Sequence, residues 1–243
     1  MKLIKLNAID STNDYLKQLA VKEDLQSFTV VTAESQTKGR GQMGAVWVTE
    51  EGKNLIMSVF IKNSVKDITA VFDLNIAVAV SIIEALQQFE IPGLRIKWPN
   101  DIMSYNFKVG GILIENNIKA DGSINSVIGL GLNVNQLDFG PLPKASSLQV
   151  ITKKLYDRDA ILNSILFEMQ KNCALSKNNP QLLWDSYLSL LFKKGIPMAF
   201  RKEITGHDFM GIIQSVNKEG ELEVLLEDDT IEKYRVKEVQ MLY

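Results

Sequence analysis

A glycine-rich loop holds the first residues whose types and spacing suggest chemistry. Residues Gly39–Gly44 read G-R-G-Q-M-G, which matches the G-x-G-x-x-G pattern of dinucleotide-binding loops. That interpretation requires a helix directly after the glycines and an acidic residue about 20 positions further on. The segment 45–61 instead predicts a strand, a turn and a second strand, and no Gly-Lys-Ser or Gly-Lys-Thr tripeptide marks a P-loop. We therefore exclude both nucleotide-binding motifs.

The same loop could still bind an anion. Three glycines within six residues let the backbone approach a ligand closely and offer N–H groups to it. Lys38 and Arg40 add positive charge there, and a guanidinium can hold a phosphate or a carboxylate with two parallel hydrogen bonds. A solvated hairpin loop explains the same residues equally well, so the loop taken alone leaves the question open.

A second polar cluster, Lys97–Asp101, interrupts an apolar strand and reads K-W-P-N-D. Proline has no N–H to donate, so Pro99 should end the strand and leave Asn100 and Asp101 in irregular backbone. A lysine, an amide and a carboxylate thereby gather at a strand end. An ordinary turn with an incidental lysine would also explain these residues.

Glycines on two further strands suggest where a ligand would lie. Gly110 and Gly111 fall inside a strand pattern, which indicates a bulge or a close approach to the backbone. Gly129 and Gly131 alternate along the next strand, so both should face the same side of the sheet. A strand face without side chains is a floor for a flat ligand. Loose β-structure near a sheet edge is the weaker explanation, because several glycine-bearing segments coincide.

Charged residues should surround this floor. We expect Arg40, Lys97 and Lys108 to ring it, with Asp101 nearby. Two or three cations and one carboxylate suit a nucleoside triphosphate with its Mg²⁺, where Asp101 would hold the metal or orient an ammonium group. No pairing of a nucleophile with a base is evident, so covalent catalysis by the enzyme is not expected.

The elements that must position these residues predict an α+β fold. Strands are expected at 3–9, 28–33, 54–61, 94–98, 101–117 and 124–135, and helices at 14–23, 67–89, 157–175 and 180–192. The run of consecutive strands favours a mixed or antiparallel sheet flanked by helices. Residues 139–147 should form a loop. After Gly195, short strands predict a small all-β barrel of about fifty residues.

Composition excludes several classes of protein. The 243 residues are 46% apolar and 23% charged, as in an ordinary globular protein. The single cysteine, Cys173, and the single histidine, His207, rule out an internal disulfide and a Cys/His zinc site. Without an apolar run of ~18 residues or a signal peptide, we expect a cytoplasmic protein with no membrane partner. Residues 195–243 carry six basic and ten acidic side chains, which argues against DNA binding.

Five motifs together resemble the biotin protein ligases. They are S-T-N at Ser11–Asn13, E-S-Q-T-K-G-R-G-Q-M-G at Glu34–Gly44, K-W-P-N-D at Lys97–Asp101, K-V-G-G-I-L-I-E at Lys108–Glu115 and G-L-G-L-N-V-N at Gly129–Asn135. They occur in that family's order, and the resemblance covers essentially the whole chain. It implies a catalytic domain over residues 1–194, similar to class II synthetases, and an SH3-like β-barrel over residues 195–243.

The resemblance also implies a two-step reaction. The biotin carboxylate attacks the α-phosphate of ATP, in the presence of Mg²⁺, and gives biotinyl-5′-adenylate and pyrophosphate. A lysine ε-amine of a biotin carboxyl carrier protein then attacks the mixed anhydride. The expected partners are thus the carrier, biotin and ATP, and the expected state is a monomer or a homodimer without a tightly bound prosthetic group.

Carried over position by position, that family's motifs imply roles for individual residues. The expected biotin-binding residues are Ser11, Thr12, Asn13, Gln36, Gly39, Arg40, Gly41, Gln42, Lys108, Gly111, Gly129 and Gly131. The expected ATP-binding residues are Arg40, Trp47, Lys97, Asn100, Lys108 and Asn133. The expected catalytic residues are Arg40, Lys97, Asp101 and Lys108, with Asp101 also a ligand for Mg²⁺. The glycine loop would close over the adenylate and exclude water.

The chain departs from the family within the loop. Gln42 stands where several relatives have a second arginine, and Ala45 where some have a further one, so the loop is less cationic. We expect no N-terminal winged-helix domain and no repressor activity, because the first strand begins at Lys2. The alternatives are a lipoate–protein ligase, which pyrophosphate exchange with each acid would separate, and a non-catalytic biotin-binding protein, which the cluster of cations opposes.

Overall fold

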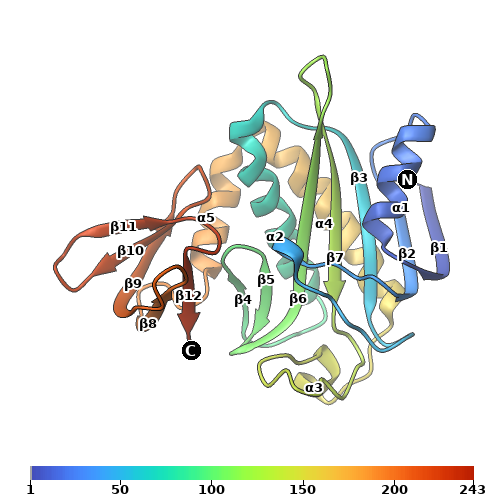
Figure 1. Cartoon of the computed structure of the whole chain (residues 1–243). Helices are drawn as coiled ribbons and strands as arrows, with labels where there is room; N and C mark the ends of the chain where they lie inside the picture. Colours follow the sequence, from blue (N-terminus) through green and yellow to red (C-terminus); the bar gives the residue numbers. More distant parts are fainter. Residues whose placement is uncertain (1) are drawn as a thin grey trace.

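A mixed seven-stranded sheet forms the centre of the larger domain (Figure 1). The computed structural model describes residues 2–243. The strands are β1 (Lys2–Ile9), β2 (Thr29–Gln36), β3 (Leu55–Val65), β4 (Leu94–Lys97), β5 (Asp101–Ser104), β6 (Phe107–Ile118) and β7 (Ile124–Leu132). Their order is β1-β2-β3-β7-β6-β5-β4, with β1 and β2 parallel and the other neighbours antiparallel. The predicted α+β fold with a mixed sheet is confirmed.

Helices cover the two faces of this sheet. They are α1 (Thr12–Lys22), α2 (Val71–Gln87), α3 (Leu148–Thr152), α4 (Arg158–Asn178) and α5 (Pro180–Leu190). Leu16 of α1 packs with Val31 and Phe60, whereas their strand neighbours Val30 and Val59 pack in the cluster that contains α2. Because successive strand residues point to opposite faces, α1 and α2 lie on opposite sides of the sheet.

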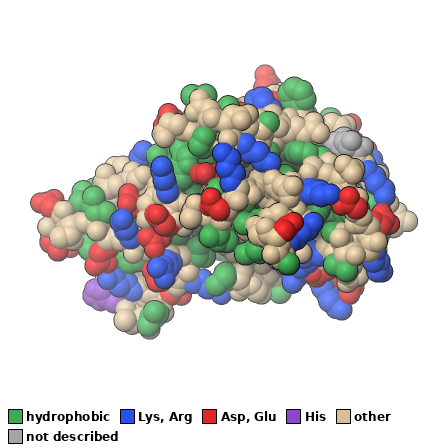
Figure 2. Space-filling view, turned by 90° about the horizontal axis from the view of Figure 1, so that it is seen from above, with side chains coloured by type: hydrophobic (Ala, Val, Ile, Leu, Met, Phe, Trp, Pro, Cys, Tyr) green, Lys and Arg blue, Asp and Glu red, His purple; other side chains and the backbone are tan. Residues whose placement is uncertain are grey.

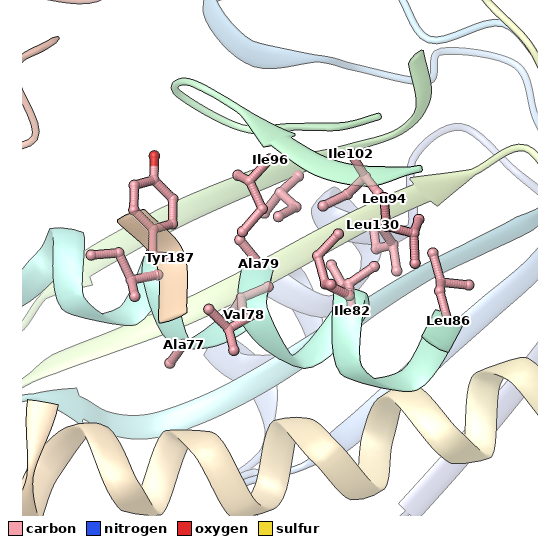
Figure 3. Close-up of a cluster of buried hydrophobic side chains, with 14 of the residues drawn as sticks. Ala77, Val78, Ala79, Ile82, Leu86, Leu94, Ile96, Ile102, Leu130 and Tyr187 are labelled. Carbon is pink, nitrogen blue, oxygen red and sulfur yellow. The ribbon is translucent and has the colours of Figure 1, made fainter. Parts of the chain in front are cut away.

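Helix α2 is buried on nearly all sides. Every residue from Ile76 to Ile83 is buried, because the helix lies between the sheet and α4. Figure 3 shows Ile82 and Leu86 of α2 beside Ile102 and Leu130 of the sheet. The stretch Ile68–Gln87 is long and apolar enough to cross a membrane, but more than half of it is buried inside the protein. Its composition is therefore that of a core helix.

A five-stranded antiparallel sheet forms the C-terminal domain. Its strands are β8 (Pro197–Lys202), β9 (Asp208–Val216), β10 (Leu222–Leu226), β11 (Ile231–Tyr234) and β12 (Val239–Leu242), in the order β11-β10-β9-β8-β12. Its buried side chains, such as Phe200 and Ile213, belong to the same apolar cluster as α2. The indole N–H of Trp98 also donates to the Gly220 carbonyl at 2.8 Å. The two domains therefore share one core and are held together across it.

Several local boundaries differ from those that the sequence predicts. The strand expected directly after the glycine loop is only an isolated bridge between Arg40 and Val46, and β3 begins at Leu55. The helix expected from residue 67 begins at Val71, after a 3₁₀ turn. Helix α3 was not predicted, although Ser147 caps it by accepting a hydrogen bond from the Val150 N–H. Short turns and caps decide these boundaries, and the strand and helix patterns do not resolve them.

Candidate active site

The predicted site residues converge on one cavity on the α1 face of the sheet. It has a volume of about 270 Å³. Fourteen of the residues expected in the site line it: Ser11, Thr12, Asn13, Gln36, Arg40, Gly41, Gln42, Trp47, Asn100, Asp101, Lys108, Gly111, Gly129 and Gly131. Gly39, Lys97 and Asn133 lie outside the lining. Segments up to 120 residues apart in sequence thus meet at one place.

Glycines form the floor of the cavity, as their alternation predicts. Gly111 on β6 and Gly131 on β7 are cross-strand partners, and Gly129 lies two residues away on the same face. A Cβ on Gly129 would lie 2.5 Å from the Asn13 side chain, and one on Gly131 would lie 2.3 Å from the Trp47 ring. Real Cβ atoms do not approach other atoms so closely. The close approach of Asn13 and Trp47 therefore requires glycine at both positions.

Trp47 lies over the floor at the Gly131 end. Its indole N–H is buried and has no hydrogen-bond partner within residues 2–243. The Lys108 ammonium lies 5.6 Å from the ring centroid, within the range of a cation–π contact. A buried donor without a partner is costly, so this indole is suited to donating to a ligand.

Hydrogen-bonding side chains form the opposite end of the cavity, beside Gly129. The Gln36 amide oxygen accepts from the Thr12 backbone N–H at 2.7 Å and from the Thr12 hydroxyl at 3.0 Å. The Ser58 hydroxyl lies 2.5 Å from the Asn13 amide oxygen and 2.8 Å from the Thr12 hydroxyl. Ser11 caps α1 by accepting from a backbone N–H, which fixes the residues that follow it. Ser58 was not predicted, and its signal is a hydroxyl within the apolar run Leu55–Ile61.

The loop arginine is held by acidic side chains in this structure. Arg40 pairs with Asp14 and lies 3.5 Å from Glu115. Lys17 lies 2.8 Å from both carboxylates. Burial alone would lower the Lys17 pKa, but its hydrogen bonds to Asp14 and Glu115 raise that pKa overall. Arg40 thus lines the cavity while carboxylates balance the charge of its guanidinium. The pairing residues Asp14, Lys17 and Glu115 were not predicted.

Lys38, the other cation of the loop, points away from the cavity. Its ammonium lies 2.9 Å from Asp10 and its side chain is largely exposed. Hydrogen bonds from Thr37 and then from Lys38 lower the Asp10 pKa. The expectation that Lys38 adds charge at the same place as Arg40 is therefore wrong, because the lysine pairs with Asp10, directly after β1.

The K-W-P-N-D residues form the turn between β4 and β5. Lys97 ends β4 and Asp101 begins β5, and the two are directly paired. The expectation that Trp98 ends a strand and that Asp101 sits in irregular backbone is wrong, because residues 98–100 make a tight turn with a cis peptide before Pro99. The Asn100 amide donates to the Ile112 carbonyl at 2.6 Å. Asn100 thus fixes the turn against β6.

Asp101 lies between two ammonium groups. Lys108 Nζ is 2.6 Å from one carboxylate oxygen and Lys97 Nζ is 3.6 Å from the other. A register shift between β5 and β6, at Ile102–Met103, occurs beside Lys108. The bulge that Gly110 suggested is therefore present. It lets residues on adjacent strands present opposite charges to one edge of the cavity.

Asn133 has a structural environment outside the cavity. It is 5% exposed, and its amide donates to the Ser146 carbonyl at 3.0 Å. Its backbone N–H donates to the Val109 carbonyl at 2.7 Å. These bonds hold the segment before α3 against the sheet, so Asn133 supports the wall and does not face the cavity.

The C-terminal domain reaches the same cavity. Val236 and Lys237, in the turn before β12, line it, and Lys237 Nζ donates to the Met43 carbonyl of the glycine loop at 2.9 Å. The Tyr243 ring centroid lies 5.2 Å from Lys97 Nζ. Burial, and then the charge of Asp101, raise the Tyr243 pKa. No sequence pattern indicated these contacts, because they join residues 146 to 194 positions apart.

Comparison with known proteins identifies the family. The model of the biotin/lipoate A/B protein ligase family matches residues 6–133, which span the helix α1, the glycine loop, the K-W-P-N-D turn and the glycine floor. The chain belongs to this family. Within it, the chain is 31% identical to the biotin–[acetyl-CoA-carboxylase] ligase of Mycobacterium tuberculosis, over 87% of this chain and 79% of that protein.

Two further relatives are also named as ligases. The chain is 30% identical to the bifunctional ligase/repressor BirA of Bacillus subtilis over 90% of this chain and 68% of that longer protein. The biotin protein ligase of Aquifex aeolicus, solved in complex with biotin and ATP, superposes with a TM-score of 0.81 and 26% identity. That likeness covers 99% of this chain and 98% of the other, so both the catalytic sheet and the C-terminal domain have counterparts in this family of ligases.

Proposed function

We propose that this protein is an ATP-dependent biotin–protein ligase. It makes biotinyl-5′-adenylate from biotin and ATP and then transfers biotin to a lysine of a biotin carboxyl carrier protein. The observation that carries the proposal is the end-to-end similarity to the Aquifex aeolicus ligase that was solved with biotin and ATP. The cavity supports it, because a hydrogen-bonding end, a bare floor and a cationic end follow one another along β7 and β6.

The hydrogen-bonding end suits the ureido ring of biotin. That ring offers one carbonyl acceptor and two N–H donors, and the side chains of Ser11, Thr12, Asn13 and Gln36 offer both kinds of partner. Ser58 adds a further hydroxyl to this set, because it contacts Thr12 and Asn13. A ligand placed here would direct its carboxylate along the glycine floor toward Lys108.

The cations then serve adenylate formation. Bringing the biotin carboxylate to the α-phosphate of ATP joins two anions, and fixed positive charges offset their repulsion. Lys108 lines the cavity at this end, and Arg40 also lines the cavity, with its guanidinium beside Asp14 and Glu115. Arg40 would exchange its pairing with Asp14 and Glu115 for the phosphate; this exchange is easy because the Arg40 side chain is 41% exposed and such pairs contribute little.

Trp47, Lys97 and Asp101 complete the proposed mechanism. Trp47 would cover the adenosine and, with the loop, exclude water from the mixed anhydride. Asp101, already facing two ammonium groups, would accept a hydrogen bond from the incoming lysine and hold it beside the anhydride carbonyl. Lys97 would balance charge at the phosphates, and Asn100 would keep the turn in place.

The cavity fits a magnesium ion carried by ATP more closely than one held by the protein. Asp101 is the single carboxylate among the lining residues, and the described part of the chain holds no cluster of three or more potential acidic, His or Cys ligands. Mg²⁺ bound with nucleotides commonly takes one or two protein carboxylates and the substrate phosphates. Asp101 would be that carboxylate.

The lipoate alternative is less compatible with the polar end. The dithiolane ring of lipoate has no hydrogen-bonding groups, so it would form no hydrogen bond with the polar end, where Thr12 bonds to Gln36 and Asn13 to Ser58. A site built to bond a ligand's polar groups discriminates strongly against a ligand that lacks them.

The remaining parts of the proposal follow from this activity. Residues 1–194 would be the catalytic domain and residues 195–243 an SH3-like barrel, acting in the cytoplasm, where ATP and the carrier are found. The acidic C-terminal segment gives no support for DNA as a partner. Figure 2 shows basic and acidic side chains interspersed on one face of the molecule.

One experiment tests the proposal. The protein would be incubated with ATP, Mg²⁺ and labelled biotin or labelled lipoate, first alone and then with a biotin carboxyl carrier domain. We expect pyrophosphate exchange with biotin and label on the carrier lysine. Exchange with lipoate alone would favour the rival ligase, and binding of biotin without exchange would indicate a non-catalytic protein.

A further inference from the structure

A hydrogen bond joins the tip of the glycine loop to the C-terminal domain. The loop is a small hairpin, closed by the bridge between Arg40 and Val46 and by the Gly41 N–H, which donates to the Ala45 carbonyl at 2.7 Å. The exposed tip residue Met43 directs its carbonyl away from this hairpin. Lys237, 194 positions later, donates its ammonium to that carbonyl at 2.9 Å.

Both residues of this contact adopt backbone angles that non-glycine residues avoid. Met43 has φ 56° and Lys237 has φ 69°. Left-handed backbone at such residues costs of order 1 kcal/mol each and persists where surrounding contacts impose it. Asparagine or glycine would be the usual residue at these positions. Two such residues meet in one hydrogen bond, which indicates that the surrounding structure holds this contact in place.

The turn that carries Lys237 is firmly held. The Glu238 N–H donates to the Arg235 carbonyl at 3.0 Å, and the Arg235 N–H donates to the Glu238 carboxylate at 2.7 Å. The Lys237 ammonium has no carboxylate within ion-pair distance among the ion pairs of residues 2–243. Its position beside the loop is therefore set by the turn and by the Met43 carbonyl.

We infer that Lys237 is a positioning residue that clamps the glycine loop in its closed place over the cavity. The loop carries Arg40 and leads to Trp47, and both residues line the cavity. Fixing the tip of the loop therefore keeps these two residues at the cavity. The C-terminal domain thereby controls how long a reactive intermediate stays enclosed. The effect on the intermediate rests on the proposed ligase function, but the clamp itself does not.

The clamp can be tested in the unliganded protein by limited trypsin digestion. Cleavage after Arg40 requires the loop to open, and its rate can be followed by mass spectrometry of the fragment that begins at Gly41. Lys237→Asn is the sharpest variant, because asparagine accepts the left-handed backbone but is too short to reach Met43. Losing one charge-assisted hydrogen bond at an exposed site should speed cleavage by up to about tenfold.

Three companion variants make the outcome decisive. Lys237→Met should behave like Lys237→Asn, and Lys237→Arg should cleave as slowly as the wild type because it restores the donor. Lys233→Met removes a lysine of the same domain that faces Glu223 at 3.7 Å and should change nothing. Equal cleavage of the wild type and Lys237→Asn would overturn the inference, as would an increase that Lys233→Met shares. Melting temperatures would show that each variant is folded.

The consequence for the intermediate is measured separately. Labelled biotinyl-adenylate is formed on the enzyme and chased with unlabelled biotin and ATP. We expect Lys237→Asn to lose label up to about tenfold faster than the wild type, with Lys237→Arg close to the wild type. Faster cleavage after Arg40 with unchanged label loss would show that the clamp does not retain the intermediate. A wild type that forms no adenylate would contradict the ligase proposal and leave the digestion result standing.

Discussion

Removing the Lys108 ammonium should abolish adenylate synthesis without unfolding the protein. In Lys108→Ala, Asp101 keeps Lys97 as a neighbour at 3.6 Å, so no carboxylate is left without a cation. The Lys108 side chain is 35% exposed, and breaking such a pair changes the free energy of unfolding by ~0–1 kcal/mol. Removing a fixed group that stabilises developing charge lowers the rate about 10²–10³-fold, or roughly 2.7–4 kcal/mol in the barrier.

The assay is biotin-dependent pyrophosphate exchange, with melting temperature measured in parallel. Lys154→Ala is the control variant, because it removes a lysine from a more exposed ion pair, 3.5 Å from Glu90 and away from the cavity lining. We expect the control to exchange at the wild-type rate. A Lys108→Ala protein that makes biotinyl-adenylate at a normal rate would refute the assignment of this lysine to the reacting anions.

Further predictions concern the floor, the polar end and the core. Gly131→Ala should raise the KM for ATP at least tenfold, because its Cβ would meet the Trp47 ring at 2.3 Å and overpacking costs about 1–3 kcal/mol. Gly111→Ala, whose Cβ would have its nearest contacts at 3.4 Å, should raise this KM less in the same steady-state assay. Ser58→Ala should raise the KM for biotin about tenfold and leave the KM for ATP unchanged, since it removes the donor 2.5 Å from Asn13. Cys173 should resist a thiol reagent at pH 8 in the native protein and react after denaturation, because burial raises its thiol pKa to about 12; rapid native labelling would contradict its burial.

The sequence predicts site residues best where the direction of side chains along a strand decides their position. Alternation placed Gly129 and Gly131 on one face, and the structure puts both under side chains that leave no room for a Cβ. The spacing of strands predicted a mixed sheet, which the pairing confirms. These inferences succeed because side-chain direction along a strand has a fixed period of two.

What the sequence could not indicate depends on which distant segments meet. Lys38 looked equivalent to Arg40, yet it pairs with Asp10, 28 residues earlier in the chain, and lies outside the cavity lining. Asn133 lies in a motif of the site, but its side-chain amide donates a hydrogen bond to the Ser146 carbonyl. Ser58 joins the polar end only because β3 lies beside β7 in the sheet. Contacts between segments distant in sequence decide each case, and a local sequence pattern does not predict such contacts.

The clamp changes how the loop's missing positive charge is understood. Gln42 and Ala45 occupy positions where several biotin protein ligases have arginine, which by itself suggests a loop that holds its adenylate weakly. Lys237 brings an ammonium group from the C-terminal domain to the residue next to Gln42, at 2.9 Å from the Met43 carbonyl. An ammonium on a backbone carbonyl holds the loop in place without adding charge to the loop itself. A Gln42→Arg substitution should therefore partly restore adenylate retention in Lys237→Asn, whereas failure to do so would mean that the two cations act on different steps.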